Sequence, residues 1–213
     1  MKTVIASLKG GSGKSTLAFN LGVWLAASSH VSIYDLDPQA TLSDVLDIRT
    51  EEEYEPQLQA VPVTAGTITR TVNAAAKKEG EVLMDVSVSE PDLFDKALKL
   101  ADRIVVPVPP SQADVWSLQR FLERVKKVAK NTEILVFINR GDTHRSVRET
   151  DETADVLAEL PGIKLLQPRL SQRTAFRRAF SEGLAVYELE PRGKAASEFV
   201  DLAKTLYPSI SIK

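Results

Sequence analysis

The chain has 213 residues, of which 43% are hydrophobic and 26% charged, a composition typical of a single globular domain spanning residues 1–213. It contains no cysteine, which excludes disulfides, thiolate metal sites and cysteine-ligated iron–sulfur clusters. The formal net charge is −2, so any attraction to nucleic acid would have to come from a local basic patch.

Apolar, β-branched runs alternate with segments of helical periodicity along the chain. We expect strands at residues 3–8, 31–35, 59–63, 82–85, 103–108, 133–139 and 164–167, and helices at 15–27, 113–130, 171–182 and 192–206. The acidic stretch at 47–55 is expected to be a surface excursion. The alternation predicts an α/β fold with a mostly parallel, twisted sheet and helices on both faces.

A glycine-rich loop follows the first expected strand, where residues 9–16 read Lys-Gly-Gly-Ser-Gly-Lys-Ser-Thr. Its glycines let backbone N–H groups approach phosphate oxygens at positions where a Cβ would collide. In such a loop Lys14 supplies a charge for the β- and γ-phosphates, and Ser15 offers a hydroxyl to Mg²⁺. The helix that follows directs its positive N-terminal dipole at the same anion. The run therefore predicts binding of a nucleoside triphosphate.

Carboxylates close two of the expected strands. Asp35 and Asp37 belong to an Asp-Leu-Asp-Pro-Gln segment, and Asp85 ends the run at 82–85. Carboxyl ends of parallel strands meet at one edge of a sheet, where these groups could hold hydrated Mg²⁺ and orient a water toward a γ-phosphate. The Asp-Pro segment would also suit an ordinary turn, and Asp85 an ordinary strand end.

Asn139 ends the strand expected at 133–139. Its amide has both a donor and an acceptor, so it could read an adenine edge. An asparagine before Arg140 and Gly141 could equally begin a turn.

Arginines gather on and just before the helix expected at 171–182. The helix would expose Arg173, Arg177 and Arg178 opposite an apolar face, with Arg169 just upstream. Unpaired arginines on one face are typical of a surface that contacts nucleic-acid phosphates. A solvated charged face is the alternative.

The motifs together resemble those of the deviant Walker A ATPases of the ParA/MinD class, most closely the short plasmid- and chromosome-partition ParA proteins. The resemblance rests on the loop, in which Lys9 is present and Leu8 replaces the usual first glycine, and on the Asp-Leu-Asp-Pro-Gln segment. It implies a three-layer Rossmann-like P-loop NTPase fold, ATP and Mg²⁺ as cofactors, and a homodimer formed face to face around two nucleotides.

The resemblance also implies a role for each motif residue. The nucleotide-binding residues would be Lys9, Gly10, Gly11, Ser12, Gly13, Lys14, Ser15, Thr16 and Asn139. Three would be catalytic: Lys9, which reaches across the dimer to the partner's phosphates, Lys14, and Asp37, which positions the attacking water. Ser15 would bind Mg²⁺ directly, and Asp35 and Asp85 would do so through water.

In this family the ATP dimer binds non-specific DNA through basic residues near the C-terminus. The resemblance therefore favours DNA contacts by Arg169, Arg173, Arg177 and Arg178. A centromere-bound ParB-type partner would stimulate hydrolysis. The expected function is that of an Mg²⁺-dependent ATPase that positions plasmid or chromosomal DNA, in the cytoplasm and on the nucleoid in its ATP state.

Two other functions stay open. A MinD-like membrane-cycling ATPase is disfavoured because residues 206–213 form no basic amphipathic tail and no apolar run approaches ~20 residues, so we expect no membrane partner. A P-loop ligase of the dethiobiotin synthetase type would transfer phosphate to a small molecule. The Asp-Pro-Gln segment and the arginine face argue against that ligase.

Overall fold

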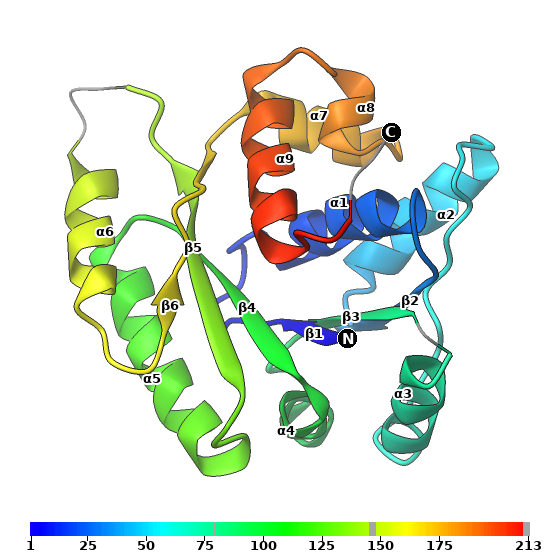
Figure 1. Ribbon diagram of the computed structural model, residues 1–213, viewed down its shortest axis with the longest axis horizontal. Coiled ribbons are helices and arrows are strands. Elements are labelled where there is room, and N and C mark those ends of the chain that lie inside the picture. Colours follow the sequence, from blue (N-terminus) through cyan, green and yellow to red (C-terminus); the bar gives the residue numbers. More distant parts are fainter. Residues whose placement is uncertain (79, 145–147, 211–213) are drawn as a thin grey trace.

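A parallel sheet organises the chain, as the computed structural model describes it for residues 1–78, 80–144 and 148–210 (Figure 1). Within these residues it has seven strands: β1 (Lys2–Ile5), β2 (Val31–Leu36), β3 (Glu81–Val86), β4 (Arg103–Val108), β5 (Glu133–Gly141), β6 (Lys164–Leu165) and β7 (Leu170–Ser171). The strand order is β2-β3-β1-β4-β5-β6, with β7 paired to β5. Each of these pairings is parallel.

Helices cover both faces of the sheet because alternate residues of each central strand point to opposite sides. Ile5 faces one layer, formed by α1 (Lys14–Ala26), α2 (Thr41–Glu51), α7 (Thr174–Ser181), α8 (Val186–Leu189) and α9 (Lys194–Leu206). Val4 faces the other layer, formed by α3 (Ile68–Ala76), α4 (Pro91–Leu100), α5 (Gln112–Val128) and α6 (Glu149–Ala158). The predicted α/β fold with helices on both faces is confirmed.

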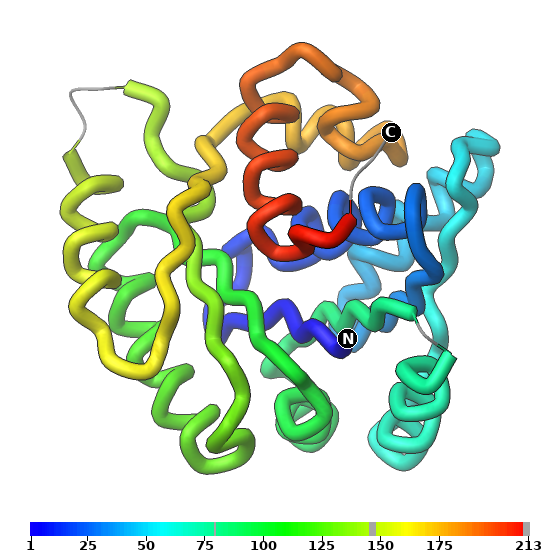
Figure 2. The backbone as a smooth tube through the Cα atoms, in the orientation of Figure 1, coloured from blue at the N-terminus to red at the C-terminus, as the bar shows by residue number. Residues whose placement is uncertain are grey.

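The C-terminal helices lie over the first helix of the chain. The tube in Figure 2 shows the orange and red part of the chain above blue α1, on the same side of the sheet. Phe180 of α7 contacts Phe19 edge-on with ring centroids 5.6 Å apart, and Phe199 of α9 contacts Trp24 in the same manner at 6.2 Å. The segment predicted to bind DNA is therefore packed against the helix that follows the glycine-rich loop.

Strand β1 occupies the point where the order of connections reverses. The chain runs from β1 to β2 and β3 on one side, and then crosses to β4 and β5 on the other. Ligands of open parallel sheets bind outside the carboxyl ends of the strands at such a switch point. The register aligns Asp85 with Asp35 on one neighbouring strand and with Ile5 of β1 on the other. Both acidic strand ends thus lie at the same edge of the sheet as the carboxyl end of β1, and Asp85 lies on the strand next to it.

One predicted strand is wrong. Residues 59–63 form only an isolated bridge between Ala60 and Ile33, supported by a hydrogen bond of 2.7 Å from the Val61 N–H to the Ile33 carbonyl. Pro62 has no N–H to continue a ladder, so the apolar run lies along the edge of β2 without becoming a strand. The acidic stretch also differs from expectation, because α2 continues through its first part to Glu51.

Candidate functional site

The phosphate loop (residues 7–13) requires glycine at two positions. Gly11 and Gly13 have φ angles of +74° and +95°, which side-chain-bearing residues rarely adopt. A Cβ on Gly13 would also lie 2.3 Å from Nδ2 of Asn139. The sequence therefore turns here into the N-terminus of α1, as the glycine pattern predicts.

Short polar contacts hold the phosphate loop from within and from β5. The Ser7 hydroxyl donates to the Lys9 carbonyl at 2.9 Å and lies 2.8 Å from Oγ of Ser12. Asn139 donates through Nδ2 to the Ser12 carbonyl at 2.7 Å. The Asn139 amide thus supports the loop, and its predicted contact with the nucleotide stays a prediction.

A cavity of about 400 Å³ opens over the phosphate loop. Its walls include Lys9, Gly10, Gly11, Gly13, Lys14, Ser15, Thr16, Asp37, Ser87 and Arg140. Most of the predicted nucleotide-binding residues therefore meet in one place, whereas Ser12, Asp35, Asp85 and Asn139 do not line it. Lys14 is only 8% exposed and makes no ion pair with any described residue. A buried cation without a carboxylate partner suits the binding of an anion.

Asp85 lies fully buried behind this cavity. Neither of its carboxylate oxygens has a hydrogen-bond partner in the part of the chain that the structure describes. Burial raises the pKa of Asp85 to about 7, although the nearby Ser15 hydroxyl and the Lys14 charge both lower it. An orphaned buried carboxylate beside a serine hydroxyl fits a hydrated Mg²⁺ ion.

In the segment of Asp35 and Asp37, one carboxylate holds a turn and the other faces the cavity. Asp35 accepts hydrogen bonds at its two oxygens, from the Asp37 N–H at 3.1 Å and from the Ser43 N–H and hydroxyl at 2.8 and 2.9 Å. It therefore fixes the turn and the first residues of α2. Asp37 accepts from the Gln39 N–H at 3.0 Å and lines the cavity.

No group of three or more His, Cys, Asp or Glu side chains that could enclose a metal occurs among the described residues. Mg²⁺ commonly keeps several waters and binds through one or two protein groups together with substrate phosphates. Ser15 and Asp85 suit that mode of binding, which stays a prediction for Ser15, Asp35 and Asp85.

Lys9 stands at the rim of the cavity and is held by α5. Its Nζ lies 2.9 Å from Oδ2 of Asp114, which also accepts a hydrogen bond from the Ser111 hydroxyl. The Lys9 side chain is 48% exposed, whereas that of Asp114 is 7% exposed. Sequence reasoning missed Asp114. The Ser-x-x-Asp spacing typical of a helix N-terminus could have drawn attention to it, since Ser111 caps α5.

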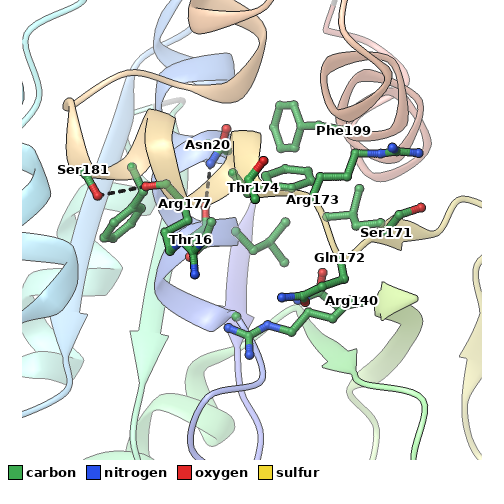
Figure 3. Close-up of a pocket in the computed structure, with 16 residues that line it drawn as sticks. Thr16, Asn20, Arg140, Ser171, Gln172, Arg173, Thr174, Arg177, Ser181 and Phe199 are labelled. Atoms are coloured by element: carbon green, nitrogen blue, oxygen red, sulfur yellow. Dashed lines mark hydrogen bonds between the residues drawn. The ribbon is translucent and has the colours of Figure 1, made fainter. Parts of the chain in front are cut away.

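A second cavity, of about 330 Å³, adjoins the first (Figure 3). Both are lined by Gly13, Thr16 and Arg140. The remaining walls come mainly from α7, from residues 170–173 and from α1, with Phe199 contributed by α9. They include Phe176 and Arg177. Its wall combines leucine and phenylalanine side chains with a larger number of polar ones, a mixture that suits a ligand with both apolar and polar parts. Sequence reasoning did not anticipate this cavity, because its walls are remote from one another along the chain.

The predicted arginine face is largely paired, so the expectation of unpaired arginines is wrong for Arg173 and Arg178. The ion pairs are Arg169 with Asp151 at 2.6 Å, Arg173 with Glu198 at 2.6 Å, and Arg178 with Glu190 at 3.1 Å. Arg177 makes no ion pair with the described residues and lines the second cavity. DNA contact by these four arginines stays a prediction.

The Arg173–Glu198 pair is the firmest of the three. Burial favours the neutral form of Glu198, but hydrogen bonds from Arg173 and from the Ser171 N–H and hydroxyl outweigh it and hold its pKa below the ordinary value. Ser171 donates to the two carboxylate oxygens at 2.9 Å each. The contact therefore joins β7 to α9.

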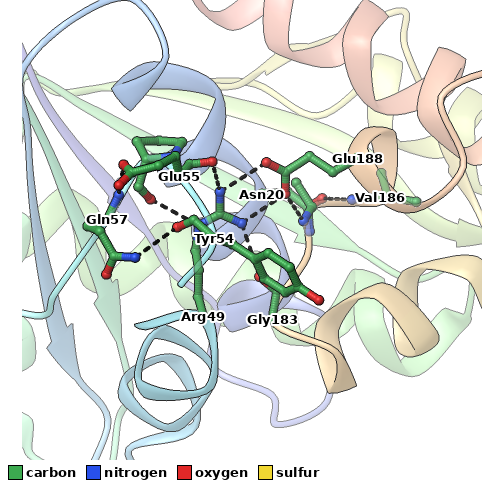
Figure 4. A network of polar contacts seen from close by, with 10 residues as sticks. Asn20, Arg49, Tyr54, Glu55, Gln57, Gly183, Val186 and Glu188 are labelled. Carbon is green, nitrogen blue, oxygen red and sulfur yellow. Dashed lines mark hydrogen bonds and ion pairs between the residues drawn. The ribbon is translucent and has the colours of Figure 1, made fainter. Parts of the chain in front are cut away.

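A fully buried arginine ties α2 to the C-terminal helices (Figure 4). Arg49 donates to both carboxylate oxygens of Glu188 at 2.9 and 3.0 Å, and to the Gly183 carbonyl at 3.0 Å. From α1, Asn20 accepts a hydrogen bond from the Val186 N–H at 2.8 Å. Since α1 follows the phosphate loop and α2 follows Asp37, both helices connect the first cavity to α8.

Comparison with known protein families shows to which family the chain belongs. The model of the CobQ/CobB/MinD/ParA nucleotide binding domain matches residues 3–186. The chain belongs to this family. The ParA/MinD resemblance that rested on the loop and the Asp-Leu-Asp-Pro-Gln segment is therefore confirmed, and the chain is a nucleotide-binding ATPase of the ParA/MinD type.

Relatives span nearly the whole chain. The "maintenance of carboxysome distribution protein A" of Halothiobacillus neapolitanus is 25% identical over 92% of this chain and 91% of its own length. The "protein ParA" of Rhizobium radiobacter is 27% identical over 89% of this chain and 86% of its own.

A solved structure confirms the P-loop fold. The septum site-determining protein MinD of Pyrococcus horikoshii, complexed with Mg-ADP, has a TM-score of 0.74 at 19% identity, covering 96% of this chain and 95% of that one. Among the described residues, no helix has the length and apolarity needed to cross a membrane.

Proposed function

We propose that this protein is a partition ATPase that binds Mg²⁺ and ATP, forms a homodimer around two nucleotides and positions plasmid or chromosomal DNA. The observation that carries the proposal is Lys14, a buried cation without a carboxylate partner in the described chain, beneath a cavity walled by the phosphate loop. ATP supplies phosphate oxygens that can accept hydrogen bonds from the Lys14 ammonium.

The residues around the cavity divide the work. Lys14 and the loop N–H groups bind the β- and γ-phosphates, and Asp37 orients the attacking water. Ser15 holds Mg²⁺ directly, and Asp35 and Asp85 hold it through water. Bound Mg²⁺ would neutralise phosphate charge, which lowers the cost of placing a triphosphate against Asp37.

Dimerisation is proposed to work through Lys9. In the single chain its ammonium rests on Asp114, in a pair that is half exposed at the lysine and therefore weak. In the dimer Lys9 contacts the phosphates of the partner's nucleotide, so that charge balance at the γ-phosphate depends on both subunits. ATP binding and subunit association are then coupled.

Lys9 provides the test of the shared site. With ATP, the wild type should form dimers in analytical ultracentrifugation, and Lys9→Ala should remain monomeric and lose ATP hydrolysis. Asp114→Asn releases Lys9 from its ion pair and should still dimerise. If Lys9→Ala dimerises and hydrolyses ATP as the wild type does, the proposed two-subunit site is wrong.

The ATP dimer is proposed to bind non-specific DNA and to be stimulated by a ParB-type centromere-binding partner. It would then reside in the cytoplasm and on the nucleoid in its ATP state. Co-sedimentation with DNA but not with liposomes, in the presence of ATP, would support this over a membrane-cycling function. ATP turnover that requires a small-molecule acceptor would instead favour a ligase.

A second cargo is suggested by the similarity to the carboxysome distribution protein of H. neapolitanus, which is 25% identical over 92% of this chain. The same ATP-driven dimer could position a protein-walled compartment on DNA. Stimulation of hydrolysis by a ParB-type protein bound to its centromere DNA supports the partition function. Stimulation by an adaptor bound to a protein shell, without centromere DNA, supports the compartment function.

A further inference from the structure

Arg140 occupies the junction of the two cavities. Together with Gly13 and Thr16 it lines both of them, and Figure 3 shows its side chain beside the second cavity, with Arg177 on another part of the wall. A nucleoside triphosphate bound at the phosphate loop could extend into the second cavity only past this junction.

The backbone at Arg140 is shaped to aim its side chain. β5 pairs with β7 at Asn139–Leu170 and at Gly141–Ser171, and the register shifts between these two pairs, so Arg140 is the bulged residue. Its φ angle is +59°, in the left-handed region that residues other than glycine seldom occupy. Bulges next to binding sites commonly redirect one side chain, and strained backbone concentrates at functional sites.

The Arg140 guanidinium is also uncommitted. It makes no hydrogen bond or ion pair with the residues that the structure describes, and the same is true of the Arg177 guanidinium in the second cavity. Arg173, which lines that cavity too, is bound to Glu198. Both side chains are exposed, so water screens their charges in the free protein, but an anion that enters the cavity would meet two guanidinium groups that no carboxylate of the described chain occupies.

We propose that Arg140 binds the α-phosphate and ribose of the nucleotide, between the phosphate loop and the second cavity. This inference rests on the proposed function, because it assumes that ATP is the ligand of the phosphate loop. With the β- and γ-phosphates on Lys14 and the nucleoside in the second cavity, the α-phosphate and ribose fall at the junction. The planar guanidinium donates a fork of N–H groups that matches phosphate oxygens.

Arg140→Gly is the variant that tests this assignment most cleanly. It removes the guanidinium, and glycine accepts a φ angle of +59° without strain, so the fold should be retained. ATP and ADP should both bind about tenfold more weakly, because the α-phosphate and ribose are common to both. Titration calorimetry of the purified full chain with each nucleotide gives the two affinities.

The control is Arg70→Ala. Arg70 is an exposed arginine of α3, on the opposite face of the sheet, and it lines neither cavity. Its loss should leave both affinities at the wild-type value, whereas Arg140→Lys, which keeps the charge but not the fork, should give an intermediate loss.

Three outcomes would overturn the inference. They are wild-type affinities in Arg140→Gly, a loss confined to ATP, which would assign the guanidinium to the γ-phosphate, and an equal loss in Arg70→Ala. Failure of the premise that ATP is the ligand of the phosphate loop looks different, because the wild-type protein would then bind neither nucleotide.

Discussion

The phosphate loop and the C-terminal segment at residues 169–190 both gather cations, but they balance the charge in different ways. Lys14, below the loop, is buried and has no carboxylate partner in the described chain. In the C-terminal segment, Arg173 and Arg178 are paired with glutamates, and Glu188 binds buried Arg49.

This difference separates residues that bind the nucleotide from residues that stabilise the fold. A cation that is already paired contributes to the stability of the free protein, whereas Lys14, which lies near the Asp85 carboxylate but makes no ion pair with it, is stabilised further when an anion arrives. The loop should therefore be sensitive to substitution mainly in nucleotide affinity, and the buried part of the C-terminal segment mainly in folding stability.

Replacing Arg49 should have the largest effect on folding. Arg49→Ala leaves Glu188 and the Gly183 carbonyl without their partner, and removal of one member of a buried ion pair costs about 3–5 kcal/mol. Urea unfolding followed by circular dichroism measures the loss. Arg49→Met combined with Glu188→Leu should recover part of it, because no charge is then left buried. A loss below about 1 kcal/mol in Arg49→Ala would contradict this role.

Lys14→Ala should lower ATP affinity about a hundredfold or more, because it removes the point charge from a site of low exposure. The free protein should lose little stability, since Lys14 makes no ion pair in the described chain. Calorimetric titration with ATP tests the first statement and urea unfolding the second. Lys204→Ala, which removes an exposed lysine of α9, is the matched control. Normal ATP affinity in Lys14→Ala would mean that the triphosphate binds elsewhere.

Gly13→Ala should lower both ATP affinity and folding stability, so it tests how far these two properties depend on different residues. The new Cβ would meet Nδ2 of Asn139 at 2.3 Å and would sit on a backbone with φ of +95°. We expect a loss of about 1–3 kcal/mol in stability and weaker ATP binding, because Asn139 must release the Ser12 carbonyl.

Gly10→Ala is the control for the stability measurement. Its Cβ would find no described atom within 4 Å, and its φ angle is not positive. If both glycine variants unfold at the same urea concentration, the close approach of Asn139 to the loop does not contribute to the free energy of unfolding.

The phosphate loop could be predicted from the sequence because its chemistry is local. Residues 9–16 contain the glycines, Lys14 and Ser15 in one run, and the alternation of apolar segments predicts the sheet edge on which they stand. The role expected of Lys9 came from the resemblance to ParA/MinD ATPases that this run carries, but its partner Asp114 is 105 residues away in the chain. No periodicity within either segment indicates that these two side chains meet.

The C-terminal segment could be predicted only in part. The apolar face of α7 follows from its spacing, and Ala175 and Ala179 are indeed buried. The acidic partners of its arginines lie on other elements, as Glu190 and Glu198 show, so the sequence alone suggested free charges. The strand predicted at residues 59–63 is wrong for a related reason. The composition of this segment indicates an extended chain, but whether an extended chain forms a ladder depends on the neighbouring strand of the sheet.

The smallest expected effect on stability belongs to Arg178, and it decides what the exposed arginines are for. Its pair with Glu190 leaves the arginine side chain 59% exposed, so Arg178→Ala should change stability by less than about 1 kcal/mol. If Arg178 contacts DNA phosphates, the same variant should bind DNA severalfold more weakly, and the log–log dependence of affinity on salt should lose about one unit of slope.

Glu190→Gln provides the opposite change at the same site. It releases the Arg178 guanidinium and removes a negative charge, so DNA affinity should rise in this variant while it falls in Arg178→Ala. Fluorescence anisotropy with a labelled duplex, at several salt concentrations and with ATP present, measures both. Equal DNA binding by the two variants would mean that Arg178 and Glu190 serve each other rather than DNA. The DNA-binding surface would then have to lie outside this ion pair.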